Sequence, residues 1–333
     1  MIKLKLFIVI IFFYSFISSN SHSLEIIRDV ELENFTKKIT STLLKNAEID
    51  HDEIKYYFIK SREINAFVTS GNNLFINTEI LISSDDYREY AAVLAHELAH
   101  ILGGHVFRTK QEIGNLGSRA IPIYVLGILG ILGGAAETGM ATLMVGSASV
   151  QDGFTYYSRT QEASADQAAI KLLCNNNIDG KFFLNFLNKL NKTIPNSSEH
   201  TSYRSTHPTI TDRTTWVKSA LVNQYNGCEF KQDRDLQEEF LFLKAKLFGF
   251  THTGEETYAV YQSDKDIDKY AKAVASYFSG DHLNSINLLN ELIAKNPENP
   301  FFRELVGEIY FSKHDYKKAI EHQKLSIEFL DEE

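Results

Sequence analysis

The chain has 333 residues, of which 44% are hydrophobic and 23% charged, with a formal net charge of −9. A chain of this length exceeds what one hydrophobic core usually supports, so we expect one large domain with a smaller one, or two domains. The acidic balance and the lack of a basic run argue against nucleic acid as a partner.

The amino terminus has the pattern of an export signal. Lys3 and Lys5 precede an apolar run from Leu6 to Ile17, and small residues then offer a cleavage site. We predict a signal peptide at residues 1–23, because the run is short for spanning a bilayer. An uncleaved membrane anchor is the alternative. Without the signal, the mature chain has 32 basic and 43 acidic side chains.

In an oxidising compartment the two cysteines, Cys174 and Cys228, could form one disulfide, although their spacing leaves this open. Neither lies in a close-spaced pair, which argues against a role as zinc ligands. Residues 24–59 are predicted to be helical with a polar face.

Two short strands are predicted next, Asn65–Thr69 and Leu74–Ile76, joined by a Ser-Gly-Asn-Asn turn. An exposed edge strand can pair with an extended polypeptide through backbone hydrogen bonds. The hairpin is therefore either a substrate-binding edge or a purely structural element.

The segment from His96 to His100 reads His-Glu-Leu-Ala-His. Residues four apart share one face of a helix, so both histidines can direct ring nitrogens at one Zn²⁺ ion. Glu97 follows the first histidine by about 100° of rotation, which places it beside the metal, where it would act as the general base toward a bound water.

We expect the helix that carries this segment to run from Ser83 to Leu102, with a capping box formed by Ser83 and Asp86. Its stop is predicted at Gly103 and Gly104. The helix is mostly apolar, and a buried glutamate is costly without a partner, so a metal site is favoured over a chance match.

Residues 120–150 are apolar and rich in glycine and alanine, with Glu137 as the single charge. We favour a buried or mobile helical hairpin near the active site, because small residues allow close helix packing. Contact with a membrane or a client protein is the alternative.

Glu162 and Asp166 lie one turn apart on a predicted helix that ends near Cys174. A catalytic zinc takes three protein ligands, so Glu162 could be the third, and Asp166 could accept the N–H of a ligating histidine. The spacing alone favours the plainer account, a solvated acidic face.

His207 precedes Pro208, which favours an extended backbone and hence a loop before a helix. Together with Arg213 it could stabilise an oxyanion or hold a substrate. A surface-loop histidine is the plainer alternative.

Residues 236–248 are predicted to be helical and residues 251–265 to be a linker, after which a 34-residue period begins. In this period Ile286 aligns with Ile320 and Ile293 with Ile327. Gly307, Tyr310 and Ala319 also fall at the spacing of a tetratricopeptide helix pair. Two units are fewer than a free-standing array needs, so the tail is expected to dock on the catalytic domain or on a partner, or to continue into further repeats.

The His96–His105, Ser158–Asp166 and Ser205–Arg213 segments, taken in this order, resemble the HtpX-like and CAAX-prenyl-protease-like zinc metallopeptidases, the family numbered forty-eight among metallopeptidases. With a signal peptide and a repeat tail, the chain is most similar to the periplasmic, outer-membrane-assembly protease branch. The resemblance covers roughly residues 30–330.

The resemblance implies a mainly α fold with a small β-sheet. A zincin-like metallopeptidase domain with the HExxH helix would occupy residues 24–250, and an α-helical tetratricopeptide-like tail residues 266–333. This tail has fewer repeats than that branch usually carries. The apolar stretch after the metal helix resembles the segment that caps the site.

The resemblance also assigns residues to a gluzincin-type site with one Zn²⁺ per chain. Glu162 would join His96 and His100 as the third ligand, with Asp166 in support. His207 corresponds to a histidine that can approach the zinc as a regulatory fourth ligand and hold the enzyme closed, and Asn65–Thr69 corresponds to the family's edge strand.

We therefore predict an exported, periplasmic zinc metalloendopeptidase that degrades misfolded or stalled cell-envelope proteins, with Glu97, His207 and Arg213 at its catalytic centre. Its partners would be polypeptide substrates and, through the repeats, the outer-membrane assembly machinery, with peripheral membrane contact left open. The alternative is a proteolytically latent assembly or chaperone-like factor that binds clients through its repeat tail.

Overall fold

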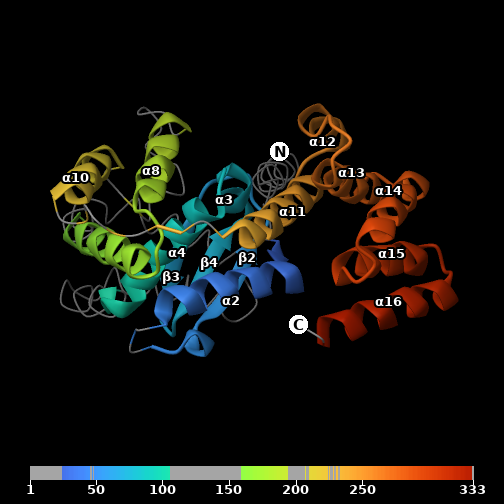
Figure 1. The fold of residues 1–333 in the computed structure, drawn as a ribbon, viewed down its shortest axis with the longest axis horizontal. Coiled ribbons are helices and arrows are strands. Elements are labelled where there is room, and N and C mark those ends of the chain that lie inside the picture. Colours follow the sequence, from blue (N-terminus) through green and yellow to red (C-terminus); the bar gives the residue numbers. More distant parts are fainter. Residues whose placement is uncertain are drawn as a thin grey trace, which may run out of the picture. The chain divides into compact units, whose positions relative to one another are not determined.

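The structure is a computed structural model, and Figure 1 shows its fold. It describes residues 25–105 apart from 46 and 48, residues 159–193, residue 207, and residues 210–331 apart from 224, 226, 227, 229 and 232. The predicted signal peptide and the apolar segment at 120–150 lie outside the described residues. Within the described ranges, no helix has both the length and the apolar character needed to cross a membrane. Helices dominate and one small sheet accompanies them, which confirms the predicted fold class.

The sheet has four strands in the order β1-β2-β4-β3. Their bounds are β1 (Ile26–Ile27), β2 (Lys55–Ile59), β3 (Ala66–Thr69) and β4 (Asn73–Asn77). The predicted hairpin is confirmed, since β3 and β4 pair antiparallel. Its turn requires left-handed backbone at Gly71 (φ 85°) and Asn72 (φ 56°), which glycine and asparagine tolerate best. β3 is an edge strand of this sheet.

The prediction of continuous helix over residues 24–59 is wrong. Only α2 (Val30–Leu44) and a short 3₁₀ turn, η1 (His51–Glu53), are helical there. β2 pairs in parallel with β4, with Tyr57 opposite Phe75, and β1 pairs antiparallel with β2. Such pairing depends on residues 18 to 33 positions away, which a local periodicity cannot report.

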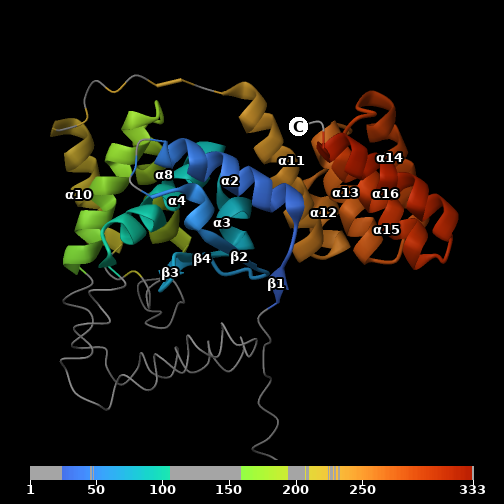
Figure 2. The same cartoon turned by 90° about the horizontal axis from the view of Figure 1, so that it is seen from below.

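The metal helix is shorter than predicted, because α3 (Thr78–Ser83) ends before α4 (Tyr87–Leu102) begins. Asp86 caps α4 by accepting from the Arg88 backbone N–H at 3.0 Å, so Ser83 is not part of a capping box. The helix stops at Gly103, and Gly104 follows with φ 60°. Figure 2 shows α2, α3 and α4 on one face of the sheet.

Three further helical segments belong to the described residues of this part of the fold. They are a helix over residues 159–175, α8 (Lys181–Thr193) and α10 (Ile210–Asn223). Cys174, in the first of them, forms a disulfide with Cys228, which follows α10, and their Cα atoms are 5.6 Å apart. α8 packs on both α4 and α10.

The carboxyl-terminal part is a series of antiparallel helices after α11 (Arg234–Thr251). They are α12 (Gly254–Val260), α13 (Asp266–Phe278), α14 (His282–Lys295), α15 (Pro300–Ser312) and α16 (Tyr316–Asp331). α12 falls within the stretch predicted to be a linker. α13 and α15 begin 34 residues apart, as do α14 and α16, in agreement with the predicted period.

α11 belongs to two hydrophobic cores. Phe240, Leu243 and Leu247 pack in the core that surrounds the sheet and α4. Phe242 and Phe250, on another side of the helix, pack against the core of α13, α14 and α15. One helix therefore supports the metal helix and the tail at the same time.

A buried ion-pair network adds to this shared packing. Lys246 of α11 lies 2.6 Å from Asp29 and 2.9 Å from Glu31, at the start of α2. The Tyr270 hydroxyl of α13 donates to Glu31 at 3.4 Å. Burial favours the neutral form of Lys246, but the facing carboxylates, chiefly that of Glu31, hold its pKa well above the usual value.

Candidate metal centre

His96 and His100 lie on the buried face of α4, with 2% and 8% of their surface exposed. Their Nε2 atoms are 3.1 Å apart, so the two rings converge on one point as the helical spacing predicted. The surrounding residues of α4 are almost all buried, which fixes the direction in which the rings point.

Glu162 reaches the same point from the helix over residues 159–175. Its carboxylate oxygens lie 3.4 Å from His96 Nε2 and 3.2 Å from His100 Nε2. Glu162 is 3% exposed and Asp166, one turn later, is fully buried. The alternative of a solvated acidic helix face is therefore wrong.

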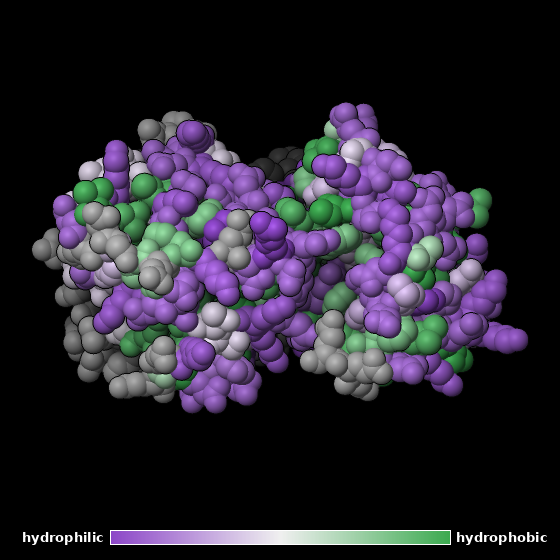
Figure 3. All heavy atoms as spheres, viewed as in Figure 1, coloured by the Kyte–Doolittle hydropathy of each residue, from purple (hydrophilic) through white to green (hydrophobic). Residues whose placement is uncertain are grey.

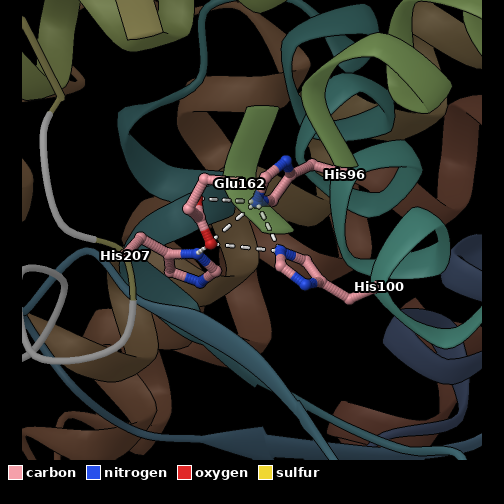
Figure 4. Close-up of side chains that lie close together, drawn as sticks. All are labelled: His96, His100, Glu162 and His207. Atoms are coloured by element: carbon pink, nitrogen blue, oxygen red, sulfur yellow. Dashed lines mark hydrogen bonds and ion pairs between the residues drawn. The ribbon is translucent and has the colours of Figure 1, made fainter. Parts of the chain in front are cut away.

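His207 completes the cluster, as Figure 4 shows. Its Nδ1 lies 3.0 Å from a Glu162 oxygen and 3.4 Å from His96 Nε2. A tetrahedral zinc with ligands at about 2.0–2.1 Å holds its donor atoms about 3.3–3.4 Å apart. Four separations among His96 Nε2, His100 Nε2, His207 Nδ1 and Glu162 Oε1 are 3.0 to 3.4 Å, close to those edges, and the four residues offer ligand atoms that all lie within 4.8 Å of one another. The residues present therefore fit one tetrahedral ion.

The charge of the site also fits a divalent cation. Three carboxylates are buried here, those of Glu97, Glu162 and Asp166, against the single guanidinium of Arg213. With neutral histidines this leaves a formal charge of −2 in the interior, which is costly without compensation. A divalent ion between the histidines and Glu162 would neutralise it.

Asp166 and Arg213 hold the ligand side chains in place through hydrogen bonds and ion pairs. Asp166 lies 2.9 Å from His96 Nδ1, so it accepts that N–H and directs Nε2 toward the cluster. Arg213, on α10, holds both oxygens of Asp166 at 2.7 and 2.9 Å and a Glu162 oxygen at 2.8 Å. Its guanidinium is engaged with these carboxylates and is 4% exposed, which differs from the expected contact with an oxyanion or substrate.

Glu97 follows His96 on α4 and is 1% exposed. One of its oxygens lies 3.3 Å from His207 Nε2. The other, Oε2, has no hydrogen-bond partner among the residues that the structure describes. A buried carboxylate oxygen with no such partner, next to a cluster of metal-binding donors, is placed to accept a proton.

His207 also contacts the edge of the sheet. Its Nε2 donates to the backbone carbonyl of Ala66, in β3, at 2.9 Å. One imidazole therefore touches the ligand cluster, the general-base candidate Glu97 and the edge strand. The alternative of a surface-loop histidine is wrong, since His207 is 3% exposed.

The pKa directions agree with the ligand form for Glu162 and His100. Burial raises the pKa of Glu162, but His207 and Arg213 outweigh this and hold it well below the usual value, so it stays ionised. Burial lowers the pKa of His100, which favours the neutral imidazole that a metal needs. Burial opposes the charged form of His207 too, but Glu162 and Glu97 raise its pKa well above normal. For His96, burial and Arg213 lower the pKa, but the carboxylates of Glu162 and Asp166 outweigh them, so without a metal its protonated form is favoured, as it is for His207.

His105 is a residue of this site to which the sequence reasoning assigned no role. It is 5% exposed, and its Nδ1 lies 3.0 Å from His100 Nδ1, on the side of that ring away from the cluster. The left-handed Gly104 returns the chain toward α4. A Cβ on Gly103 would come within 2.6 Å of His105 Nε2, so the ring needs glycine at that position.

Two histidines one turn apart, a glutamate directly after the first, and a further acidic ligand define a metal-dependent peptidase type of centre. The sequence comparison agrees with this class. Residues 31–220 match peptidase family M48, and the chain belongs to this metalloprotease family.

Curated relatives carry related names. The beta-barrel assembly-enhancing protease of Yersinia pestis is 26% identical over 310 residues, which cover 90% of this chain and 62% of that protein. The protein of the same name from Escherichia coli strain K12 is 23% identical over 91% of this chain and 63% of its own length. A protease HtpX homolog of Helicobacter pylori strain J99 is 26% identical over 57% of this chain and 68% of its own. The chain thus spans a little under two thirds of the first two relatives.

Proposed function

We propose that this protein is a zinc-dependent endopeptidase of the gluzincin type that acts on misfolded or stalled polypeptides of the cell envelope. The observation that carries this proposal is the tetrahedral spacing of four buried donors with Glu97 alongside. Zinc suits a set of imidazole and carboxylate donors at these separations.

His96, His100 and Glu162 would hold the metal. When bound there, zinc polarises a scissile carbonyl and acidifies a water molecule. Glu97 would accept the proton of the attacking water and pass it to the leaving amine. Burial alone would raise the pKa of Glu97, but His207 outweighs this and lowers it, so the carboxylate is ionised and can act as a base.

Asp166 and Arg213 would act as positioning residues. Asp166 orients the His96 ring, and Arg213 ties Asp166 to Glu162. This replaces the oxyanion role that we expected for Arg213.

His207 would hold this arrangement closed. A catalytic zinc keeps one position open for water and substrate, and a fourth protein donor fills that position. An extended substrate would pair with β3 through backbone groups such as the Ala66 carbonyl, to which His207 donates. The substrate and His207 would therefore compete for the same place, which makes the enzyme latent until His207 moves away.

The Glu97→Gln variant tests the mechanism. Glutamine keeps the volume of Glu97 but cannot accept the proton, so we expect full zinc content and a loss of at least about 10²-fold in cleavage of casein or a misfolded β-barrel protein. Zinc is measured by elemental analysis of the same samples. Undiminished turnover by the zinc-loaded variant would contradict the assignment of the base.

The fourth donor, His207, favours a second function in which the zinc is structural. A site closed by four protein ligands is typical of structural zinc, and the protein would then be an assembly or chaperone-like factor that binds clients through its tail. The His207→Ala variant separates the two proposals. Increased proteolysis relative to the unaltered chain supports a latent peptidase, whereas inactivity of both supports the binding factor.

We also propose export to the periplasm and contact with the outer-membrane assembly machinery. The signal-like amino terminus and the disulfide between Cys174 and Cys228 support an oxidising compartment. The names of the Yersinia and Escherichia relatives support a link with β-barrel assembly. Fractionation of cells that express the full chain tests the location, and recovery in the cytoplasm would contradict it.

A further inference from the structure

Helix α16, at the end of the described residues, carries an exposed apolar face. Tyr316, Ile320 and Ile327 are 52%, 56% and 58% exposed, and their spacing of four and seven residues places them on one side of α16. Phe311, at the end of α15, is 65% exposed and its ring centroid lies 5.6 Å from that of Tyr316. We call these four residues the α16 face. Hydrophobic residues interrupt the hydrophilic surface in this region in Figure 3.

The preceding repeat shows what such a face packs against. Ile286 and Ile293 of α14 stand 34 residues before Ile320 and Ile327, and each of them is only 8% exposed. They are buried in one core with α15, the helix that follows. The α16 face has the same side chains at the same positions, while no element in the described part of the chain covers it.

The charges along α16 differ between its two ends. Lys313, Lys317 and Lys318 stand before and within its first turn, where Asp315 pairs with Lys318 at 3.5 Å. Glu321 and Lys324 lie in the middle, and Glu328 and residues 331–333 make the other end acidic. A helix of this kind is complementary to a copy of itself that runs in the opposite direction, because each basic end meets an acidic end.

We propose that the α16 face binds the α16 face of a second copy of this chain, in an antiparallel arrangement about a two-fold axis. Ile320 of one protomer then packs against Ile327 of its partner, and the same contact recurs on the other side of the axis. Lys317 of one protomer approaches Glu328 of the other. A parallel arrangement would instead bring like charges together.

The interface would be weak, because four apolar side chains on one helix bury less than a standard interface. We expect a dissociation constant on the order of 10 µM, so that the chain is monomeric when dilute and dimeric when concentrated. Such an equilibrium would join two catalytic units through their tails.

Sedimentation equilibrium of the full chain tests this proposal. The expected mass rises from 37.9 kDa toward twice that value as the concentration increases to about 200 µM. Ile327→Glu should weaken dimerisation by at least about tenfold. The control is Val222→Glu on α10, a residue of similar exposure at 65%, which should leave it unchanged.

A charge exchange makes the orientation testable and guards against variants that merely unfold. Lys317→Glu alone should weaken the dimer, and Lys317→Glu combined with Glu328→Lys should restore it, because the reversed charges again attract. A chain that stays monomeric at the highest concentration overturns the proposal, even if another protein binds the α16 face. A dimer that Ile327→Glu leaves unchanged overturns it as well.

Discussion

Replacement of His105 by alanine should weaken zinc binding without removing any ligand. His100 directs Nε2 at the donor cluster, so its proton must be on Nδ1, and this N–H donates to His105 Nδ1 at 3.0 Å. Both rings are buried, with 8% and 5% of their surface exposed. Alanine would leave the His100 N–H without this acceptor and free the ring to rotate.

The size of the effect follows from the hydrogen bond that is lost. An unsatisfied buried donor costs about 1–3 kcal/mol, which corresponds to roughly a 5- to 150-fold loss in zinc affinity. This agrees with the about 10- to 100-fold losses found when partners of metal ligands are removed. Competition with a chromophoric chelator measures the affinity directly and does not depend on catalysis.

Three matched variants sharpen the experiment. His105→Asn keeps an acceptor near the Nδ1 position and should recover most of the affinity. Gly103→Ala leaves His105 intact but places a Cβ within 2.6 Å of its ring, so it should weaken zinc binding too. His252→Ala, which removes a histidine stacked on Phe248, should change nothing. Unaltered zinc affinity in His105→Ala would refute the reasoning.

Three other predictions concern the supports of the site and the stability of the fold. Asp166→Asn should lower zinc affinity by about tenfold or more, because Asp166 orients His96, and chelator competition measures this loss. Burial raises the pKa of Glu79 from 4.5 to about 7, so its carboxyl binds a proton more tightly in the folded chain than in the unfolded one. The contribution of Glu79 to the free energy of unfolding therefore falls as the pH rises from 4.5 to about 7. Glu79→Gln should remove that loss and raise stability at pH 8 in urea unfolding by about 1–2 kcal/mol, which is less than the full shift would give because solvent screens this partly exposed carboxyl. An unchanged pH profile would contradict the assignment. Cys174→Ser should cost about 2–4 kcal/mol, since the disulfide closes a loop over a separation of 54 residues, and reduction of the unaltered chain should lower the melting temperature in the same way.

The sequence predicted the local parts of the site well. His96, Glu97 and His100 lie within one helix, and helical geometry alone places them on neighbouring faces. The helix stop at Gly103 and the hairpin of β3 and β4 also follow from local rules.

The convergence of distant residues could not be predicted from periodicity. Glu162 and His207 reach the cluster from 66 and 111 positions beyond His96, and their spacing along the chain suits a solvated surface equally well. The number of ligands that a catalytic zinc takes made Glu162 a candidate, but only the resemblance to a family favoured Glu162 and His207 as ligands over the surface alternatives. His105 was missed because it follows two glycines that mark the end of a helix, and only the left-handed backbone at Gly104 returns it to His100.

The sheet was predicted only in part for a related reason. The antiparallel pair β3 and β4 is joined by a short turn, which the sequence reveals. β2 pairs in parallel with β4 although β3 lies between them in the sequence. Neither a turn signal nor a simple alternation of apolar and polar residues therefore marks this pairing.

Because helix α11 packs in both hydrophobic cores, truncation of the chain at residue 251 or 265 would not separate two independently folded parts. Such a truncation would strip the cover from Phe242 and Phe250 and would take Tyr270 away from the buried Lys246 and Glu31 pair. A fragment without the tail would therefore lose stability and solubility together. Loss of activity on deletion of the tail would then report a damaged catalytic part, and only point variants on the surface of the repeats can show what the tail binds.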